Sequence, residues 1–163
     1  MPLYTRKNSL RLKGYDYSQA GAYFVTICTY NRIHLFGEVE DGEMRPSKLG
    51  AIVAACWMDI PTNYPRVELA DSVIMPNHLH GILILHEEKL QQTLSRMVAS
   101  YKGAVTHHAK QTDIGIDLET PVWQRNFHDR IIRNEHEYGI IAAYIENNPA
   151  LWEQDKFYET GAS

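Results

Sequence analysis

The chain has 163 residues and a formal net charge of −4, a length that suits one domain with a sizeable core and does not require a second. Its two cysteines, Cys28 and Cys56, show no metal or redox spacing, which argues against a disulfide framework and favours a reducing compartment. No signal peptide or membrane-span pattern is visible, so we expect a soluble cytoplasmic protein, with 1–163 forming a single domain.

Positive charge is concentrated in two segments despite the acidic total. Residues 1–15 and 89–112 contain basic side chains and no acidic ones. Such separation can give an acidic protein one positive face, which would permit a phosphate-bearing partner without requiring one. We expect 1–15 to be a basic N-terminal arm.

The first elements are a strand and a helix. Residues 22–30 are rich in β-branched and aromatic types, which indicates a buried strand. Apolar residues then recur at helical spacing over 47–63, with Ser47 as the expected N-cap and a stop before Pro65.

The middle of the chain predicts a strand pair and a second helix. Two apolar runs, 67–74 and 79–85, flank a Met-Pro-Asn turn signal and are expected to pair antiparallel. Helical spacing returns over 90–108, and 111–120 has the composition of a loop.

The last elements complete the expected fold. Residues 122–132 predict a fourth strand, and 135–147 predict a helix with one buried stripe that ends near Pro149. The order β-α-β-β-α-β plus one helix predicts an α+β, ferredoxin-like fold, in which an antiparallel sheet carries helices on one face and a C-terminal helix is added.

A His-Leu-His sequence is the main chemical motif. Side chains alternate along a strand, so His78 and His80 point to one face while Leu79 enters the core. The pair can supply two ligands to a metal ion, although a single motif of this kind is more often structural.

The end of the predicted last helix supplies further candidates. Tyr144 and Asn148 are four residues apart and share a helical face if the last turn is regular. An amide oxygen can complete a site with the two histidines, and Tyr144 would stand beside the ion. Because a residue before proline disfavours helical geometry, Asn148 is also a candidate helix cap, and Asn147 is the alternative ligand.

Five blocks of the sequence resemble the REP-associated tyrosine transposases, which belong to the single-tyrosine HUH transposases. In chain order the blocks are 14–18, 23–29, 75–81, 123–133 and 144–149. The resemblance spans nearly the whole chain and favours the metal-binding interpretation of the histidines.

This resemblance implies a ferredoxin-like enzyme that cleaves and rejoins single-stranded DNA. Tyr144 would be the nucleophile, and His78, His80 and Asn148 would hold a divalent cation, either Mg²⁺ or Mn²⁺. Related insertion-sequence transposases have glutamine where this chain has Asn148. The expected substrate is single-stranded DNA from a hairpin-forming repeat, and the resemblance leaves open whether a homodimer forms.

Several basic or polar residues are candidate DNA contacts, each against the alternative of an ordinary solvated side chain. The set comprises Arg6, Arg11, Lys13, Lys102, Thr106, Arg125, Arg130 and Arg133. Trp123 can either pack or stack on a base.

Two other functions compete with the transposase interpretation. The same fold could bind single-stranded or hairpin nucleic acid without cutting it. Alternatively, a metal-dependent hydrolase could use water, in which case Tyr144 is structural and no covalent intermediate forms.

Overall fold

A computed structural model describes residues 4–5, 21–86, 90–112, 114 and 119–158 of the chain. Its main sheet is antiparallel throughout, with strand order β1-β5-β6-β2-β7. The strands are β1 (Tyr4–Thr5), β2 (Gly21–Cys28), β5 (Val67–Met75), β6 (His78–Leu85) and β7 (His128–Ile132). Without β1, this is the strand order of the expected ferredoxin-like fold, which is confirmed.

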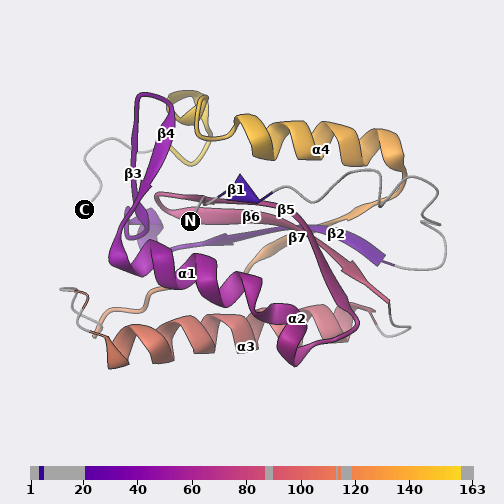
Figure 1. Ribbon diagram of the computed structural model, residues 1–163, viewed down its shortest axis with the longest axis horizontal. Helices are drawn as coiled ribbons and strands as arrows, with labels where there is room; N and C mark the ends of the chain where they lie inside the picture. Colours follow the sequence, from indigo (N-terminus) through magenta and orange to yellow (C-terminus); the bar gives the residue numbers. More distant parts are fainter. Residues whose placement is uncertain (1–3, 6–20, 87–89, 113, 115–118, 159–163) are drawn as a thin grey trace.

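Helices cover both faces of the sheet (Figure 1). One face carries α1 (Lys48–Met58), α2 (Ile60–Asn63) and α3 (Leu90–Gln111), and the other carries α4 (Glu135–Asn147). Alternation along the central strands produces the two cores. Leu79 and Leu83 of β6 pack with α1 and α3, whereas Ile82 and Ile84 pack with α4.

The predicted helix over 47–63 is divided in two. Ser47 caps α1 as expected, because its Oγ accepts a hydrogen bond from the Gly50 amide at 3.0 Å. The first helix, α1, ends at Met58, and α2 begins at Ile60. Pro61 lies in the first turn of α2, where backbone N–H groups have no partner within the helix, so the N–H that proline lacks is not needed.

The predicted strand over 122–132 is regular only in its second half. Trp123 forms an isolated bridge with Thr29, and β7 starts at His128. Between them, the Lys102 ammonium donates to the carbonyl oxygen of Gln124 at 2.8 Å, and to those of Arg125 and Asn126 at 3.4 Å. These carbonyl oxygens accept hydrogen bonds from Lys102 of α3 instead of from the backbone of a neighbouring strand.

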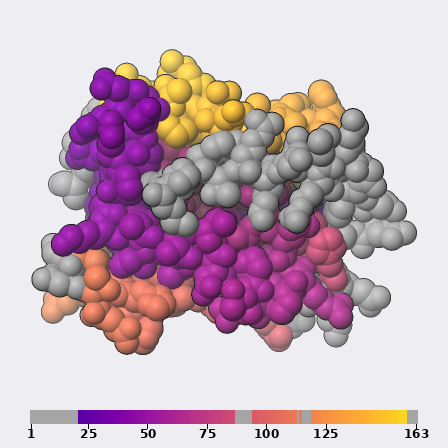
Figure 2. Space-filling model, viewed as in Figure 1, coloured from indigo at the N-terminus to yellow at the C-terminus, as the bar shows by residue number. Residues whose placement is uncertain are grey.

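A hairpin that we did not predict projects from the sheet. It consists of β3 (Gly37–Glu40) and β4 (Glu43–Pro46), joined by Asp41 and Gly42, both of which have positive φ. A Cβ added to Gly42 would lie 3.6 Å from Ala150, so the hairpin tip contacts the segment after α4. Figure 2 shows the purple hairpin beside the yellow C-terminal residues.

The described helices lack the properties of membrane-spanning segments. None of them combines the length and the apolar character that a bilayer crossing requires.

Candidate metal and nucleophile site

Two histidines at the start of β6 form the centre of the site. Strand alternation places His78 and His80 on the α4 face, with ring centroids 4.5 Å apart and exposed fractions of 0% and 1%. The Nε2 atom of each ring is buried and has no hydrogen-bond partner among the described residues. Buried polar atoms are rarely left unsatisfied, so two such nitrogens side by side indicate a site for a ligand.

Neighbouring side chains fix the orientation of both rings. The Nδ1 atom of His78 lies 2.8 Å from Asn77 Oδ1, and that of His80 lies 2.8 Å from Thr26 Oγ1. The amide nitrogen of Asn77 donates to the carbonyls of Arg32 and Phe157. Its oxygen must therefore accept the Nδ1 proton of His78, which leaves the Nε2 lone pair available to a metal.

The end of α4 adds an amide to this group. Asn148 is the C-cap, as the sequence suggested, with φ −57° and ψ −47° despite the following proline. It is 3% exposed, and its Oδ1 is buried without a hydrogen-bond partner in the described parts of the chain. Asn147, the alternative ligand, is exposed. The structure therefore brings Asn148, and not Asn147, to the histidines.

A carboxylate that the sequence analysis missed completes the group. The ligand atoms of His78, His80 and Asp155 all lie within 4.8 Å of one another. Asp155 Oδ2 accepts a hydrogen bond from the Asn148 amide at 3.1 Å, and Oδ1 accepts one from the Phe157 amide at 2.8 Å. Imidazole and carboxylate together suit a divalent cation, so these residues fit the metal that the resemblance implies.

Burial and positive charge keep both histidines neutral. Burial is the main cause that holds the pKa of His78 well below its usual value; the charge that His80 would carry if protonated, and the charges of Arg32 and Lys156, add to the effect. The nearby amide of Asn148 partly opposes it. Burial, followed by the charge of Lys156, lowers the pKa of His80 to about 3. Neutral imidazole is the form that binds metals, so no proton competes at neutral pH.

Tyr144 lies next to the histidines and remains accessible. Its side chain is 40% exposed, and its ring centroid is 5.3 Å from that of His80 and 6.3 Å from that of Phe24. Burial first and the charge of Asp155 second raise the pKa of Tyr144. A phenol at this position needs a nearby positive charge before it can act as a nucleophile near neutral pH.

Comparison with known proteins identifies the relatives of the chain. No model of a known protein family matches the sequence. An uncharacterised protein from Haemophilus influenzae is 40% identical over 171 residues, and the match covers 93% of each chain. The chain belongs to the same family as this protein.

Solved structures establish the fold independently. The structure of a REP-associated tyrosine transposase bound to a REP hairpin matches with a TM-score of 0.61 and 20% identity, over 85% of this chain and 72% of that one. A candidate transposase from Deinococcus radiodurans matches with a TM-score of 0.53 and 20% identity, over 78% of this chain and 90% of that one. This chain has the REP-associated tyrosine transposase fold, which confirms the resemblance at the level of architecture.

One of the predicted DNA-contact residues lies on the face of the sheet that carries Tyr144. Arg130 is directly opposite Phe24 in the β2–β7 register, so both side chains point to the face where Phe24 meets Tyr144. His128 is similarly opposite Thr26. Arg133 follows β7 and is exposed; its backbone amide donates to Glu137.

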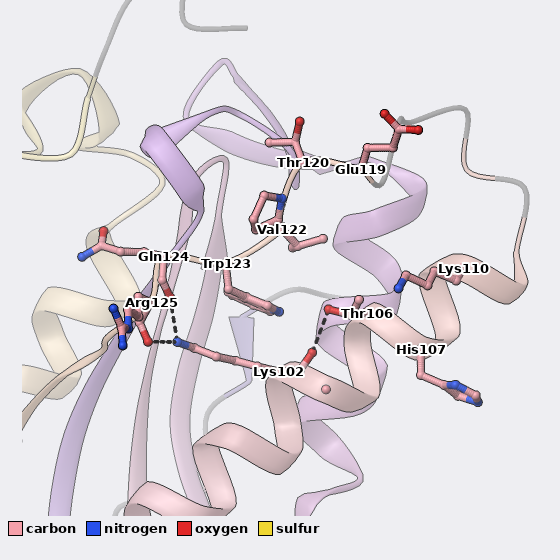
Figure 3. Close-up of a pocket in the computed structure, with 12 residues that line it drawn as sticks. Lys102, Thr106, His107, Lys110, Glu119, Thr120, Val122, Trp123, Gln124 and Arg125 are labelled. Carbon is pink, nitrogen blue, oxygen red and sulfur yellow. Dashed lines mark hydrogen bonds between the residues drawn. The ribbon is translucent and has the colours of Figure 1, made fainter.

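Three other predicted contacts meet at the outer edge of the sheet. Lys102 and Thr106 come from α3 and line a pocket together with Arg125 (Figure 3). Thr106 Oγ1 donates to the carbonyl of Lys102 within the helix. Burial lowers the pKa of Lys102, whose ammonium also holds the 124–126 carbonyls. The predicted contacts Arg6, Arg11 and Lys13 lie outside the described residues.

Two basic residues near the candidate metal ligands were not predicted. The Arg32 guanidinium carbon lies 5.3 Å from the ring centroid of Phe157, and the Lys156 ammonium lies 5.2 Å from it. Phe157 in turn packs against His78, with ring centroids 4.4 Å apart. Neither basic residue belongs to a recognisable motif, and only the folded chain shows their position.

Proposed function

We propose that this protein is a metal-dependent endonuclease and strand transferase for single-stranded DNA, a transposase that acts through a phosphotyrosine intermediate. The observation that carries the proposal is the convergence of buried, unsatisfied ligand atoms beside an accessible tyrosine. His78, His80 and Asn148 each contribute such an atom, and Tyr144 stands next to them. The fold of the solved transposases supports the same conclusion.

The reaction is a transesterification at Tyr144. The phenolic oxygen attacks a backbone phosphorus, the bond from phosphorus to the 3′ oxygen breaks, and the phenolic proton is ultimately transferred to that oxygen. The products are a 5′-phosphotyrosine and a free 3′-hydroxyl. Because a phosphodiester bond replaces another, the step is near balance and can be reversed on a second strand without nucleotide fuel.

The proposed metal ligands are His78, His80 and Asp155, with Asn148 as a further oxygen donor. A bound Mg²⁺ or Mn²⁺ would neutralise charge on the phosphate and favour the ionised phenol. Asp155 holds Asn148 in place through the hydrogen bond between their side chains. Asn77 and Thr26 orient the imidazoles toward the same point.

The proposed substrate is a single strand from a hairpin-forming repeat. The REP-associated tyrosine transposase of similar fold was solved with a REP hairpin. We propose that Arg130 contacts a phosphate beside Tyr144, because this residue of β7 pairs with Phe24 of β2 and Phe24 meets Tyr144 on the same face. We further propose that Lys102, Thr106, Arg125, Arg133 and the arm residues Arg6, Arg11 and Lys13 contribute contacts elsewhere along the DNA.

A single chain contains the whole proposed site. Tyr144 reaches His80 of its own chain, so we propose that a monomer is competent and that a homodimer is not required. If so, a mixture of a His78→Ala variant and a Tyr144→Phe variant should remain inactive. Recovery of cleavage on mixing would show that tyrosine and histidines from different chains form the site.

The Tyr144→Phe substitution tests the proposed nucleophile. Single-stranded repeat DNA labelled at its 3′ end should form a covalent adduct with the wild-type protein and Mn²⁺, visible as a labelled band after denaturing electrophoresis. The adduct should disappear with Tyr144→Phe or with a chelator, while DNA binding changes little. Tyr64→Phe, at the end of α2, is the matched control and should retain the adduct.

Each alternative function gives a different result. Cleavage that persists in Tyr144→Phe, with no adduct in the wild type, would indicate a metal-dependent hydrolase that uses water. Binding of the hairpin without any cleavage in the presence of metal would indicate a nucleic-acid-binding module.

A further inference from the structure

A second site lies beyond the metal ligands, between α3 and the segment 119–125. Its pocket has a volume of about 670 Å³, within the range of small-ligand sites. Figure 3 shows Lys102, Thr106 and Lys110 on the helix side, with Val122 and Trp123 on the opposite segment. The indole of Trp123 extends from this segment toward α3.

The segment that forms one wall is held firmly. The amide of Tyr30 donates to the carbonyl of Val122 at 3.0 Å, and the amide of Gln124 donates to that of Cys28 at 2.9 Å. Lys102 holds the other side of the segment through the Gln124 carbonyl. The pocket is therefore preformed by hydrogen bonds to β2 and α3.

The lining combines an aromatic wall with basic groups at the rim. The ring of Trp123 packs on Phe36 and Tyr101, with centroids 5.3 and 5.8 Å away, so its position is fixed. Its Nε1 is buried without a hydrogen-bond partner in the described part of the chain. The exposed side chains of Lys110 and Arg125 supply positive charge. An apolar wall flanked by cations is the pattern that binds a base and its phosphate.

The pocket is connected to the proposed cleavage site. An adjacent pocket of about 730 Å³ shares Trp123, Gln124 and Arg125 with it and extends to Arg32. The guanidinium of Arg32 lies against Phe157, which packs on His78. The adjacent pocket thus extends from the pocket at α3 to Arg32, which lies two ring contacts from His78 of the proposed cleavage site.

We propose that the pocket between α3 and the segment 119–125 binds one unpaired nucleotide of the strand that Tyr144 cuts. The base lies against Val122 and Trp123, and the phosphate lies at Lys110 and Arg125, away from the Glu119 carboxylate on the rim. The identity of the strand rests on the proposed function, whereas the nucleotide chemistry of the pocket rests on its own lining. A base stacked and paired within a duplex has neither a free face nor room to enter.

Tryptophan signals provide a test that does not depend on cleavage. The chain has three tryptophans, whose indole N–H resonances can be followed in ¹⁵N-labelled protein. Titration with dAMP, dCMP, dGMP and dTMP in turn should shift the Trp123 signal for at least one nucleotide. Trp57 of α1 is buried in the core, with 2% of its surface exposed. Its signal is the internal control and should not shift.

Charge reversal identifies the phosphate contact. Lys110→Glu should weaken the nucleotide response by about tenfold or more, because one phosphate contact becomes repulsive. Lys48→Glu reverses the charge of another exposed lysine, on α1, and should leave the response unchanged. A Trp123 signal that is unmoved by all four nucleotides would overturn the proposal, as would an equal shift with inorganic phosphate alone.

The two proposals can fail separately. If the covalent adduct forms but the Trp123 signal does not respond to nucleotides, the proposed nucleotide pocket is wrong and the proposed function stands. If the Trp123 signal responds to nucleotides but no adduct forms, the nucleotide pocket stands and the proposed nuclease activity is wrong.

Discussion

The third proposed metal ligand distinguishes this candidate site at the scale of single residues. The sequence analysis placed Asn148 there, and the structure adds a carboxylate from Asp155 within 4.8 Å of the histidine ligand atoms. A carboxylate contributes a negative charge that an amide lacks, so the cation would be held more strongly. Its charge also raises the pKa of Tyr144, an effect that a bound cation would oppose.

Replacing Asp155 tests its role as a ligand. In Asp155→Asn, we expect the affinity for Mn²⁺ to fall by about tenfold to a hundredfold, because a charged ligand is lost. Isothermal titration calorimetry gives the dissociation constant directly. Glu153→Gln removes an exposed carboxylate two residues away and should bind Mn²⁺ as the wild type does. Equal affinities for the two variants would exclude Asp155 from the ligand set.

His78 could be predicted as a site residue from the sequence, whereas Asp155 could not, and the reason is the local regularity of the backbone. The histidines lie in a regular strand, where alternation alone places them on one face. Asp155 follows the short 3₁₀ turn Trp152–Gln154, where no periodicity indicates the direction of a side chain. Its position depends on hydrogen bonds with Asn148 and Phe157 that exist only in the folded chain.

At the scale of elements, close packing between β6 and α1 supports the strand that carries the histidines. A Cβ added to Gly81 would lie 2.2 Å from Trp57 Cζ2, so no larger residue fits without displacement of the indole. Gly81 follows His80 directly, and its lack of a side chain lets Trp57 of α1 pack against the strand behind the candidate metal ligands.

A pair of glycine substitutions tests this packing. We expect Gly81→Ala to lower the free energy of unfolding by about 1–3 kcal/mol, because the core is overpacked. Gly103→Ala is the contrasting variant, since nothing lies within 4 Å of its added Cβ on α3, and it should stabilise by up to about 1 kcal/mol. Urea denaturation of both proteins measures the difference. A neutral Gly81→Ala would contradict the described contact.

The two helices on the far face are joined by a buried tyrosine. The hydroxyl of Tyr101 on α3 donates to the carbonyl of Val53 on α1 at 2.9 Å, and its ring meets Trp57 edge to face. Burial, with a smaller effect of Cys56, raises the pKa of Tyr101 well above its usual value of 10.0. The folded protein therefore keeps this proton at pH values where the unfolded chain loses it.

This difference predicts a pH-dependent stability. The raised pKa contributes stability that is fully present below pH 10 and is lost as the pH rises further, because only the unfolded state releases the proton. Tyr101→Phe should cost about 1 kcal/mol at pH 8 through the lost hydrogen bond. Above pH 10, the difference in free energy of unfolding between the variant and the wild type should become smaller. Urea unfolding at pH 8 and above pH 10 measures this difference. A gap that stays constant would show that Tyr101 ionises equally in both states.

The predictability of the elements followed their regularity. The helix over 135–147 was predicted at its observed bounds, because its buried stripe and flanking signals are clear. The hairpin β3–β4 was missed, although Asp41-Gly42 is a two-residue turn signal that could have revealed it. The irregular half of 122–132 depends on the distant Lys102, which local sequence cannot indicate.

At the scale of the whole molecule, the proposed metal site joins the sheet to the segment after α4. The ligands come from β6, the end of α4 and the residues beyond Pro149. A cation bound by all of them would resist separation of α4 from the sheet, so metal binding should stabilise the entire fold.

Thermal unfolding measures this coupling. At a Mn²⁺ concentration about a hundred times the dissociation constant, we expect the wild type to gain about 2.7 kcal/mol and several degrees in Tm. A His78→Ala, His80→Ala double variant should show no such shift. Metal-free buffer with a chelator provides the baseline for both proteins. An equal shift in the double variant would place the stabilising ion elsewhere.

The distance along the chain between the metal ligands has a consequence for biosynthesis. His78 and His80 leave the ribosome long before Asp155, which follows every strand and helix of the main sheet. A growing polypeptide can therefore fold most of its scaffold while its ligand set is still incomplete. The proposed metal site would be complete only after Asp155 has left the ribosome, so the proposed cutting of DNA would not begin on shorter nascent chains.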